Sequence, residues 1–329
     1  MPRAVVFHRL GGPEVLEIGE VAVGPPAPGE VQICVKAFGV NRAEAQFRAG
    51  LYIEDAELPS GLGLEAAGVV QSLGSDVHAF SPGDRVAVIP PISMKTRPVH
   101  AERINFPADM LVRLPQQQSF EAAAATWMAF LTVYGALVDI ASASTGDHVV
   151  VTAASSSVGL AALQVIRALG ATSIAVTRAA EKREALLLAG ADHVVVSDGA
   201  DIADEILKIT GAAGARVTFD PVGGAMVGPL AAAAAVGGVI IGYGALDAGP
   251  IVIPSAVVLG KRLTLRGYLV HEVVTDPARL ENAKAYVLQG LASGAFRPAI
   301  AKIFSLDAIA EAHRYLESNV QMGKVVVTL

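Results

Sequence analysis

One stretch of the chain limits its fold more than any other, because an apolar run leads directly into a turn of small residues and then an amphipathic helix. The run and the turn cover Val149–Ser157, and the pattern predicts a helix over Val158–Leu169. The first backbone N–H groups of such a helix have no partners inside it, and that end carries a partial positive charge. The turn is therefore suited to holding a phosphate group.

The turn keeps only part of the glycine pattern that is typical of dinucleotide binding. The three glycine positions of G-x-G-x-x-G fall on Ala154, Ser156 and Gly159, so only the last glycine is present. The serines add bulk but offer hydroxyl groups to a pyrophosphate. We therefore predict cofactor contacts from Ser155, Ser156 and Ser157, although the motif alone is equally typical of any parallel α/β protein.

The end of the next predicted strand, Ser173–Thr177, indicates which dinucleotide is preferred. An NAD-binding unit places an acidic residue there for the ribose 2′-hydroxyl, whereas this chain has Thr177 and Arg178. The nearest acid, Glu181, is expected inside the following helix. Arg178 and Lys182 lie one turn apart and can pair with a 2′-phosphate, for which the planar fork of arginine is suited. The pattern favours NADPH over NADH.

The second half of the chain alternates strands with helices that end at glycines. The predicted strands are Val149–Thr152, Ser173–Thr177, His193–Val196, Val217–Asp220 and Val239–Tyr243. Such alternation predicts a doubly wound parallel sheet, whose ligands lie at the carboxyl ends of the strands. Two further strand ends, Asp220–Gly224 and Gly242–Gly244, are expected beside the serine turn, where their glycines either admit a flat cofactor or only turn the chain.

The first 120 residues show a different sequence pattern, with short apolar runs separated by glycine and proline. This part is predicted to be mainly β, with one helix over Arg42–Ala49 and a loop at Leu51–Ile53. The end of the chain shows two helices, Pro277–Leu288 and Ile309–Glu317, and a final strand, Lys324–Leu329. This last segment has too few strands for a core of its own, so we expect it to return to the β-rich domain.

Length and charge exclude some classes of function. A chain of 329 residues exceeds the usual size of one core and suggests two domains. The net charge of −6, without a dense run of Lys or Arg, argues against a nucleic-acid surface. The N-terminus lacks the pattern of a signal peptide, which predicts a cytoplasmic protein. The apolar run Ala122–Val138 is slightly short for a membrane span and is predicted to be a buried helix.

Metal-ligating residues are sparse in this sequence. Cys34 is the only cysteine, so neither an intrachain disulfide nor a cysteine-rich zinc site can form. The seven histidines are scattered and none forms an H-E-x-x-H pair. We predict no metal site.

Several ordered motifs resemble those of the medium-chain dehydrogenase/reductase superfamily, and within it those of the zinc-free quinone oxidoreductases related to zeta-crystallin. The resemblance covers essentially the whole chain. It is carried, together with the serine turn, by His8–Leu16, Gly39–Arg42, Gly61–Val70, Gly83–Val86, Leu131–Tyr134 and Gly323–Val325. It implies an α/β chain with two domains: a GroES-like β-rich catalytic domain, 1–122 completed by 267–329, and a Rossmann NADP-binding domain, 123–266.

The resemblance also implies that the chain works without zinc. Zinc-dependent alcohol dehydrogenases of the superfamily have a cysteine where this chain has Asn41 and a histidine where it has Leu64. Their four-cysteine structural lobe is missing as well. A Lewis-acid mechanism would therefore lack its ligands.

Site roles follow from the resemblance by motif position. Asn41 corresponds to a polar residue that faces the nicotinamide and the substrate, and Thr132 to one that touches the nicotinamide end. Ser197 stands where relatives often have a tyrosine that binds the ribose phosphate. The remaining residues implied to line the cofactor are Val158, Gly159, Val222, Gly242, Tyr243 and Lys324.

Hydride transfer without a metal requires an electron-poor acceptor held at the right distance from the donor ring. Quinones meet this demand, and so do enals, enones and enoyl thioesters. The side-chain amide of Asn41 is a candidate donor to the oxygen that gains negative charge, and Tyr52 is a candidate proton donor. The alternatives are a helix cap for Asn41 and a loop aromatic that covers the cleft for Tyr52.

Two expectations concern partners. The resemblance and the exposed sheet edge expected at Ile251–Pro254 and Leu263–Arg266 predict a homodimer. The substrate is expected to be a small electrophile, a quinone or an activated alkene. A non-catalytic NADPH-binding protein is the third interpretation, and the acidic charge makes binding of RNA the weakest one.

Overall fold

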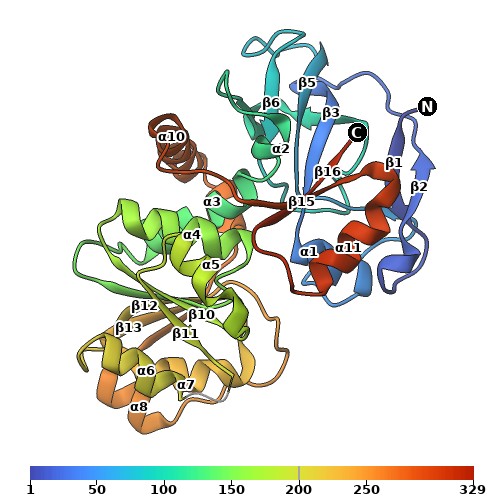
Figure 1. The fold of residues 1–329 in the computed structure, drawn as a ribbon. Helices are drawn as coiled ribbons and strands as arrows, with labels where there is room; N and C mark the ends of the chain where they lie inside the picture. Colours follow the sequence, from blue (N-terminus) through green and yellow to red (C-terminus); the bar gives the residue numbers. More distant parts are fainter. Residues whose placement is uncertain (199–200) are drawn as a thin grey trace. The chain divides into compact units, whose positions relative to one another are not determined.

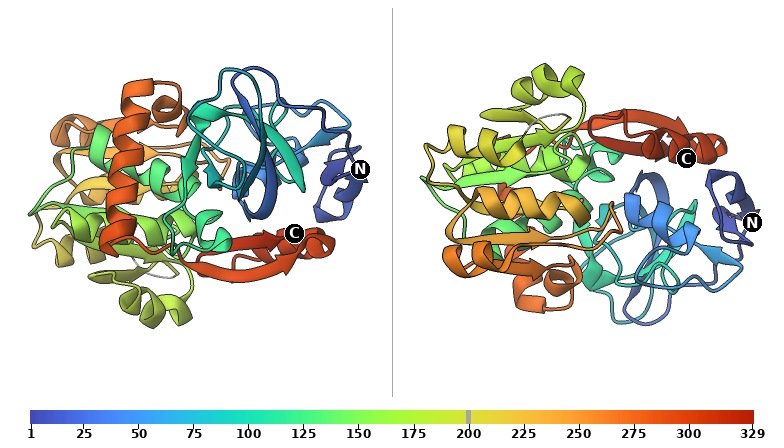
Figure 2. Two further views of the ribbon diagram at one scale, coloured as in Figure 1. Left: turned by 90° about the horizontal axis from the view of Figure 1, so that it is seen from above. Right: turned by 90° about the horizontal axis from the view of Figure 1, so that it is seen from below.

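A computed structural model describes residues 1–198 and 201–329. Contacts divide the chain into two compact units, Met1–Ala129 with Arg297–Leu329, and Phe130–Phe296 (Figure 1). The first unit is rich in antiparallel strands and the second is a parallel sheet with helices, as Figure 2 shows from two further sides. The predicted α/β fold class, a β-rich domain plus a doubly wound sheet, is confirmed.

The first unit contains two sheets. The larger runs in the order β15 (Ile300–Ser305), β16 (Lys324–Thr328), β3 (Glu30–Val40), β5 (Glu65–Leu73), β6 (Arg85–Val88) and β8 (Leu111–Arg113), with β7 (Arg103–Pro107) also paired with β3. The smaller has the order β2 (Glu17–Glu20), β1 (Arg3–Phe7) and β4 (Ser60–Gly61). Their apolar side chains form one core that includes Phe7, Ile33, Phe38 and Val327.

Two predicted features of the first unit are confirmed. Helix α1 spans Arg42–Ala49 and ends at Gly50, whose φ of +71° is the left-handed conformation that glycine adopts without strain. The part of the chain from Arg297 onward returns to the β-rich unit, because β16 pairs antiparallel with β3 and α11 (Ile309–Glu317) belongs to the same unit. The predicted helix Pro277–Leu288, expected to return with it, belongs to the second unit. This pairing brings the start of β16 to the end of β3.

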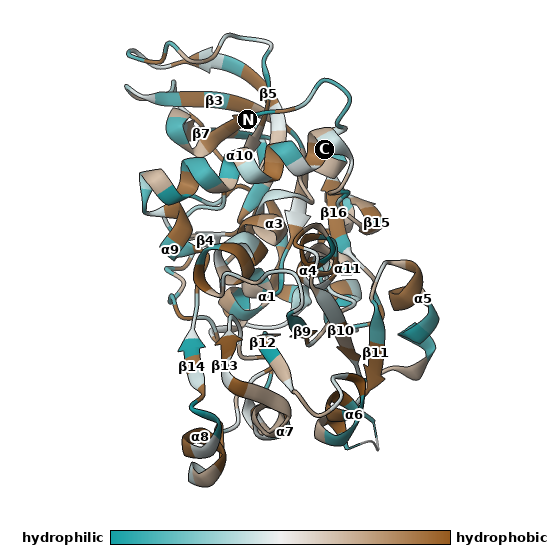
Figure 3. Ribbon diagram, turned by 90° about the vertical axis from the view of Figure 1, so that its left-hand side faces the viewer, coloured by the Kyte–Doolittle hydropathy of each residue, from teal (hydrophilic) through white to brown (hydrophobic). Residues whose placement is uncertain are grey.

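The second unit is built on a six-stranded parallel sheet. Its order is β11 (His193–Val196), β10 (Thr172–Thr177), β9 (His148–Val151), β12 (Ala215–Asp220), β13 (Ala234–Gly242) and β14 (Thr264–Gly267). Its helices include α4 (Ser157–Ala168), α5 (Arg183–Leu188), α6 (Ile202–Ile209), α7 (Val227–Ala233) and α8 (Ser255–Lys261). Figure 3 shows hydrophobic residues along strands such as β11, as expected for a sheet covered on both faces.

The last helices of the second unit are α9 (His271–Val274) and α10 (Pro277–Ser293). The Arg279 Nε donates to Asp139 at 2.7 Å, and the rings of Phe130 and Phe296 stack with centroids 5.0 Å apart. Residues 267–296 thus pack against the helical residues that follow 129. The domain boundaries drawn from the sequence, after 122 and after 266, assign this segment to the other domain.

The apolar helical stretch Phe120–Ile140 consists of α2 (Phe120–Ala123), α3 (Trp127–Val133) and a π-helical part, Tyr134–Ile140. It is long and apolar enough to cross a membrane by length and composition, and 72% of its apolar 18-residue segment is buried within the structure. Such burial is typical of a core helix, which is the structure that the sequence predicts.

Packing of α7 on the sheet leads to a stability prediction. Leu230 is fully buried in α7, whereas Leu188 in α5 is 82% exposed. Replacing Leu230 by Ala removes core contacts and leaves a cavity, so we expect a loss of about 2–5 kcal/mol in the free energy of unfolding. The same substitution at Leu188 should change it by less than about 0.5 kcal/mol. Chemical denaturation of both variants measures the difference, and equal losses would contradict this description of the core.

Candidate active-site residues

Asn41 lies where the central strand β3 passes into α1, and it is 8% exposed. Gly39, two residues earlier, pairs with Glu65 across the sheet. A Cβ atom at Gly39 would clash with the Ala124 backbone carbonyl oxygen and would also lie 2.7 Å from the Glu65 Oε1, so only glycine fits at this position. The local sequence therefore brings an amide and a carboxylate to the same place.

Lys324, the first residue of β16, connects these two groups. Its Nζ donates to the Asn41 Oδ1 at 2.6 Å and also to the Glu65 Oε1. Lys324 and Glu65 are each 1% exposed, and the second carboxylate oxygen of Glu65 accepts from the Met128 backbone N–H at 3.1 Å. Charges at this depth are stable only when they are paired and hydrogen-bonded, and both conditions are met here.

Glu44 completes the surroundings of Asn41 from the third position of α1. Its oxygens accept from the Asn41 backbone N–H at 2.8 Å, from the Asn41 Nδ2 at 3.0 Å and from the Leu64 N–H at 3.0 Å. Burial raises the pKa of Glu44 to about 8, against the opposing effects of the Asn41 hydrogen bonds and the Lys324 charge. The carboxyl group is thus mainly protonated at neutral pH.

His100 lies beside this carboxyl group. Its ring stacks on Phe38 with centroids 3.9 Å apart, and its Nε2 is 3.2 Å from the Gly39 carbonyl oxygen and 3.6 Å from the Glu44 Oε1. Burial lowers the pKa of His100 to about 3, so the ring is neutral at physiological pH. Because a carbonyl oxygen only accepts, the neutral ring carries its hydrogen on Nε2.

Tyr52 follows α1 in the loop that the sequence analysis identified. Its ring packs edge-on against Phe47, with centroids 6.5 Å apart, and the side chain stays partly exposed. Burial raises the pKa of Tyr52, and the charges of Glu54 and Glu44 add to the increase. The phenol therefore keeps its proton at neutral pH, which a proton donor requires and a covering aromatic residue allows.

In the second unit, the serine turn leads from β9 into α4. The helix begins at Ser157 and ends at Ala168, one residue before each predicted bound, and the Ser156 Oγ accepts from the Gly159 N–H at 3.0 Å. A Cβ atom at Gly159 would lie 2.5 Å from the Ala154 carbonyl oxygen. The one glycine that the motif keeps is thus the one that close packing of this turn requires.

Two cations lie at the carboxyl end of β10. The Lys182 Nζ donates to the Ser155 Oγ at 3.1 Å, while Arg178 is exposed. Burial lowers the pKa of Lys182, and the charge of Arg178 lowers it further against the opposing effect of Glu181. At the neighbouring strand end, the Ser197 N–H donates to the Thr177 carbonyl oxygen at 2.8 Å. A phosphate group would relieve the repulsion between the two cations.

Asp220 organises the next strand end, where β12 finishes. Its carboxylate accepts from the Thr152 hydroxyl, from the Val222 N–H at 3.0 Å and from the Gly223 N–H at 2.9 Å. The Tyr243 N–H donates to the Asp220 carbonyl oxygen at 2.9 Å. The turns after β9, β12 and β13 are thereby tied together at one edge of the sheet, as the parallel topology predicts.

Tyr243 extends this edge after Gly242, the last residue of β13. Its ring stacks on Phe219 with centroids 4.0 Å apart, and its hydroxyl is buried next to Ser156. Burial raises the pKa of Tyr243, and the Asp220 charge adds to the increase. Thr132, the remaining predicted cofactor contact, is buried in α3.

Several members of these clusters were not predicted from the sequence. Asn41 and Glu44 have the spacing of a capping box, a signal that could have identified Glu44. Glu65 stands directly after Leu64 in a motif that was recognised, but its partner Lys324 is 259 residues away. His100 has no local signal, because long-range contacts bring it to the site: its ring stacks on Phe38 and its backbone N–H donates to the Leu62 carbonyl oxygen.

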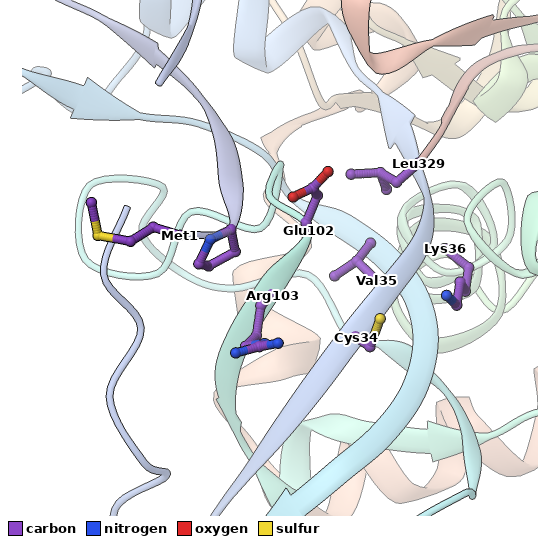
Figure 4. Close-up of a pocket in the computed structure, with 8 residues that line it drawn as sticks. Met1, Cys34, Val35, Lys36, Glu102, Arg103 and Leu329 are labelled. Carbon is purple, nitrogen blue, oxygen red and sulfur yellow. The ribbon is translucent and has the colours of Figure 1, made fainter. Parts of the chain in front are cut away.

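The two pockets found in the first unit lie elsewhere. One of about 480 Å³, shown in Figure 4, is lined by residues of both chain ends, of β3 and of the start of β7, among them Met1, Cys34, Lys36, Arg103 and Leu329. A second of about 360 Å³ shares Cys34, Lys36 and Arg103 with the first. None of the predicted site residues lines either pocket. Among the residues that the structure describes, no group of three or more His, Cys, Asp or Glu side chains is arranged to hold a metal ion.

Known proteins are similar to this chain over nearly its full length. The family model of the alcohol dehydrogenase GroES-like domain matches residues 27–116, and that of the zinc-binding dehydrogenase matches residues 157–285. Quinone oxidoreductase 1 of Escherichia coli K12 is 33% identical, with 98% of both chains covered. The 2-haloacrylate reductase of a Burkholderia species is 29% identical, with 99% of both covered. The crystal structure of Escherichia coli quinone oxidoreductase complexed with NADPH aligns with a TM-score of 0.90 at 30% identity, covering 99% of this chain and 100% of that one.

The buried carboxyl group of Glu44 leads to a prediction about pH. Its pKa is about 8 in the folded protein and close to 4.5 when unfolded, so the folded state binds more protons between these values. Stability from this group is complete below about pH 4.5 and is lost as pH rises through 8. Glu44→Gln, which imitates the protonated acid, should remove this loss. Denaturation midpoints of both proteins from pH 5 to pH 9 measure it, and parallel curves would contradict a raised pKa.

Proposed function

The chain belongs to the quinone oxidoreductase branch of the medium-chain dehydrogenase/reductase superfamily, and from this premise we propose that it transfers hydride from NADPH to a quinone. Members of this branch are enzymes, so the chain is an oxidoreductase. The observation that carries the choice of cofactor is the pair of cations, Arg178 and Lys182, beside the serine turn. The choice of a quinone as substrate rests on the similarity to quinone oxidoreductases.

The residues of the second unit fit a dinucleotide phosphate. The first N–H groups of α4, with the hydroxyls of Ser155 and Ser157, would hold the pyrophosphate. Arg178 and Lys182 would hold the 2′-phosphate, and no acidic residue stands at the end of β10 to repel it. The related Escherichia coli enzyme was crystallised with NADPH. When bound, NADPH supplies the hydride.

Asn41 would donate a hydrogen bond, and Tyr52 a proton, to the substrate oxygen that gains negative charge. One N–H of the Asn41 amide is held by Glu44 at 3.0 Å, whereas its contact to the Gly39 carbonyl oxygen is long, at 3.4 Å. A substrate oxygen can replace such a weak bond and receive the hydrogen bond instead. The protonated phenol of Tyr52 would then deliver a proton. Both roles are proposals that follow from motif position and from this geometry.

Reduction of an activated alkene is the second candidate function. The full-length similarity to a 2-haloacrylate reductase favours it, because such a substrate carries a C=C bond conjugated to a carboxylate. Hydride would reach the β-carbon of an enal, enone or enoyl thioester, and the same donors would stabilise the resulting negative oxygen. The residues of the site suit both electrophiles.

One experiment separates these functions. NADPH oxidation is followed with 1,4-benzoquinone and with a trans-2-alkenal side by side, the organic products are identified, and NADH replaces NADPH as a control. Turnover with the quinone alone supports the first proposal, and saturation of the alkenal supports the second. NADPH binding without either reaction would favour a binding protein, and absence of NADPH binding would overturn both proposals.

The last points concern the oligomeric state, the location, the partners and the need for zinc. We propose a homodimer through β14, because this strand is the sheet edge and exposed apolar side chains lie on it and near it: Leu265 (48%), Val252 (68%) and Leu259 (76%). The molar mass in solution tests this state. A cytoplasmic location, no nucleic-acid or membrane partner and catalysis without zinc stay predictions, and metal analysis of the purified active protein tests the last one.

Arg178 provides the test of cofactor preference. Arg178→Ala removes charged hydrogen bonds to the 2′-phosphate, each worth about 1.5–3 kcal/mol, so NADPH affinity should fall about 10- to 100-fold. NADH affinity should stay within about threefold, because NADH lacks this phosphate. Fluorescence titration with each dinucleotide measures both. Arg314→Ala, at an exposed arginine of the first unit, is the control, and equal losses for NADPH and NADH would contradict the assignment.

Tyr52→Phe tests the proton donor. Removal of the hydroxyl should lower kcat with an enone at least about tenfold while KM changes little, since general acids contribute most in the transition state. Steady-state kinetics with the enone measure both constants. The matched control is Tyr315→Phe in α11, whose ring packs on Phe304. Unchanged turnover in Tyr52→Phe would leave Tyr52 as a covering residue only.

A further inference from the structure

We infer that Lys324 is a positioning residue, whose ammonium group orients and polarises the side-chain amide of Asn41 and does not contact the cofactor directly. The inference rests on the proposed role of Asn41 in the reaction. The resemblance placed Lys324 among the residues that line the cofactor, so the two assignments predict different effects of the same substitution.

Backbone geometry delivers Lys324 to this position. Gly323 has a φ of +107°, and a Cβ atom there would lie 2.5 Å from the Ala299 carbonyl oxygen. The Lys324 N–H donates to that same oxygen at 2.7 Å. Because Val325 pairs with Val40, Lys324 lies just beyond the end of β3, next to Asn41. The Gly-Lys pair therefore directs the side chain inward at this point.

The ammonium group is bound to protein atoms on the inside of the unit. Its two described partners are the Asn41 Oδ1 and the Glu65 Oε1, and the side chain is 1% exposed. Glu65 balances its charge, and Glu65 is itself anchored by the Met128 N–H. This arrangement leaves the ammonium group facing Asn41 and Glu65, away from solvent.

The bond to Lys324 determines how the Asn41 amide is turned. An ammonium group has no acceptor, so it must face the amide oxygen, and the Nδ2 must then face Glu44 and Gly39. The cation also draws electron density toward the oxygen, which strengthens the N–H groups as donors. The positive charge of Lys324 thus makes the Asn41 N–H a stronger donor, and this N–H is the group proposed to bind the negative substrate oxygen.

The test uses Lys324→Met together with Glu65→Met, because removal of the lysine alone would leave a buried carboxylate unpaired. We expect kcat of the double variant to fall at least about tenfold and its NADPH Kd to stay within about threefold. When Asn41 is also replaced by Ala, the same two substitutions should change kcat by less than about threefold, since effects through a shared group are not additive. Lys302→Met, on the neighbouring strand β15, is the matched control.

A second measurement does not depend on activity. The chain has four asparagines, so labelling with ¹⁵N-asparagine gives four side-chain amides, and Asn41→Ala identifies the signal of interest. Hydrogens of the Asn41 amide should exchange slowly in the wild-type protein and at least about tenfold faster in the double variant. The inference would be overturned if the exchange rate of the Asn41 amide were unchanged in the double variant. It would also be overturned if the two substitutions raised the Kd for NADPH tenfold or more, both with Asn41 present and in Asn41→Ala. A wild-type protein that neither binds nor oxidises NADPH would refute the proposed function, while the exchange rates would still decide whether Lys324 holds Asn41.

Discussion

The buried ion pair between Lys324 and Glu65 is the interaction on which the first unit depends. It joins the last strand, β16, to β5, and through Asn41 it reaches the junction of β3 and α1. Such a pair costs desolvation free energy and is stable only with complete hydrogen bonding. Glycines at 39 and 323 allow the necessary close approach of the backbone. Lys324, near the end of the chain, is thus bound to Glu65 and Asn41 from its first part. Asn41 is the residue that is proposed to take part in the reaction.

In the second unit, the arrangement proposed for binding the dinucleotide consists of backbone N–H groups and cations at one edge of the parallel sheet. The parallel sheet brings the ends of β9, β10, β12 and β13 to one edge, and Asp220 ties the turns together there by accepting from Thr152, Val222 and Gly223. Ser155 and Lys182 connect the serine turn to the cations after β10. Loss of two glycines from the usual motif is therefore compatible with a well-defined turn.

Local patterns predicted the elements well, because helix α1, helix α4 and the parallel strands each depend on short-range periodicity and on caps such as Gly50 and Ser156. They also located the serine turn, whereas Asn41 was singled out by the family resemblance, through its motif position. They could not reveal the contacts of Glu65 and His100 near Asn41, since these residues come from separate segments and meet only through packing. Glu44 differs, because its capping-box spacing with Asn41 is a local signal. The boundary after residue 266 stays a prediction, whereas contacts group residues 267–296 with the segment after residue 129, against which α10 packs.

The central claim is that this chain moves hydride from NADPH to an electron-poor acceptor. Single-turnover oxidation of NADPH deuterated at C4, mixed rapidly with 1,4-benzoquinone or a trans-2-alkenal, tests it directly. Hydride transfer should make oxidation slower with deuterium than with hydrogen on one face of the ring, and the label should be lost from that face. Rapid mixing that leaves the label and the NADPH absorbance unchanged with both acceptors would contradict the account.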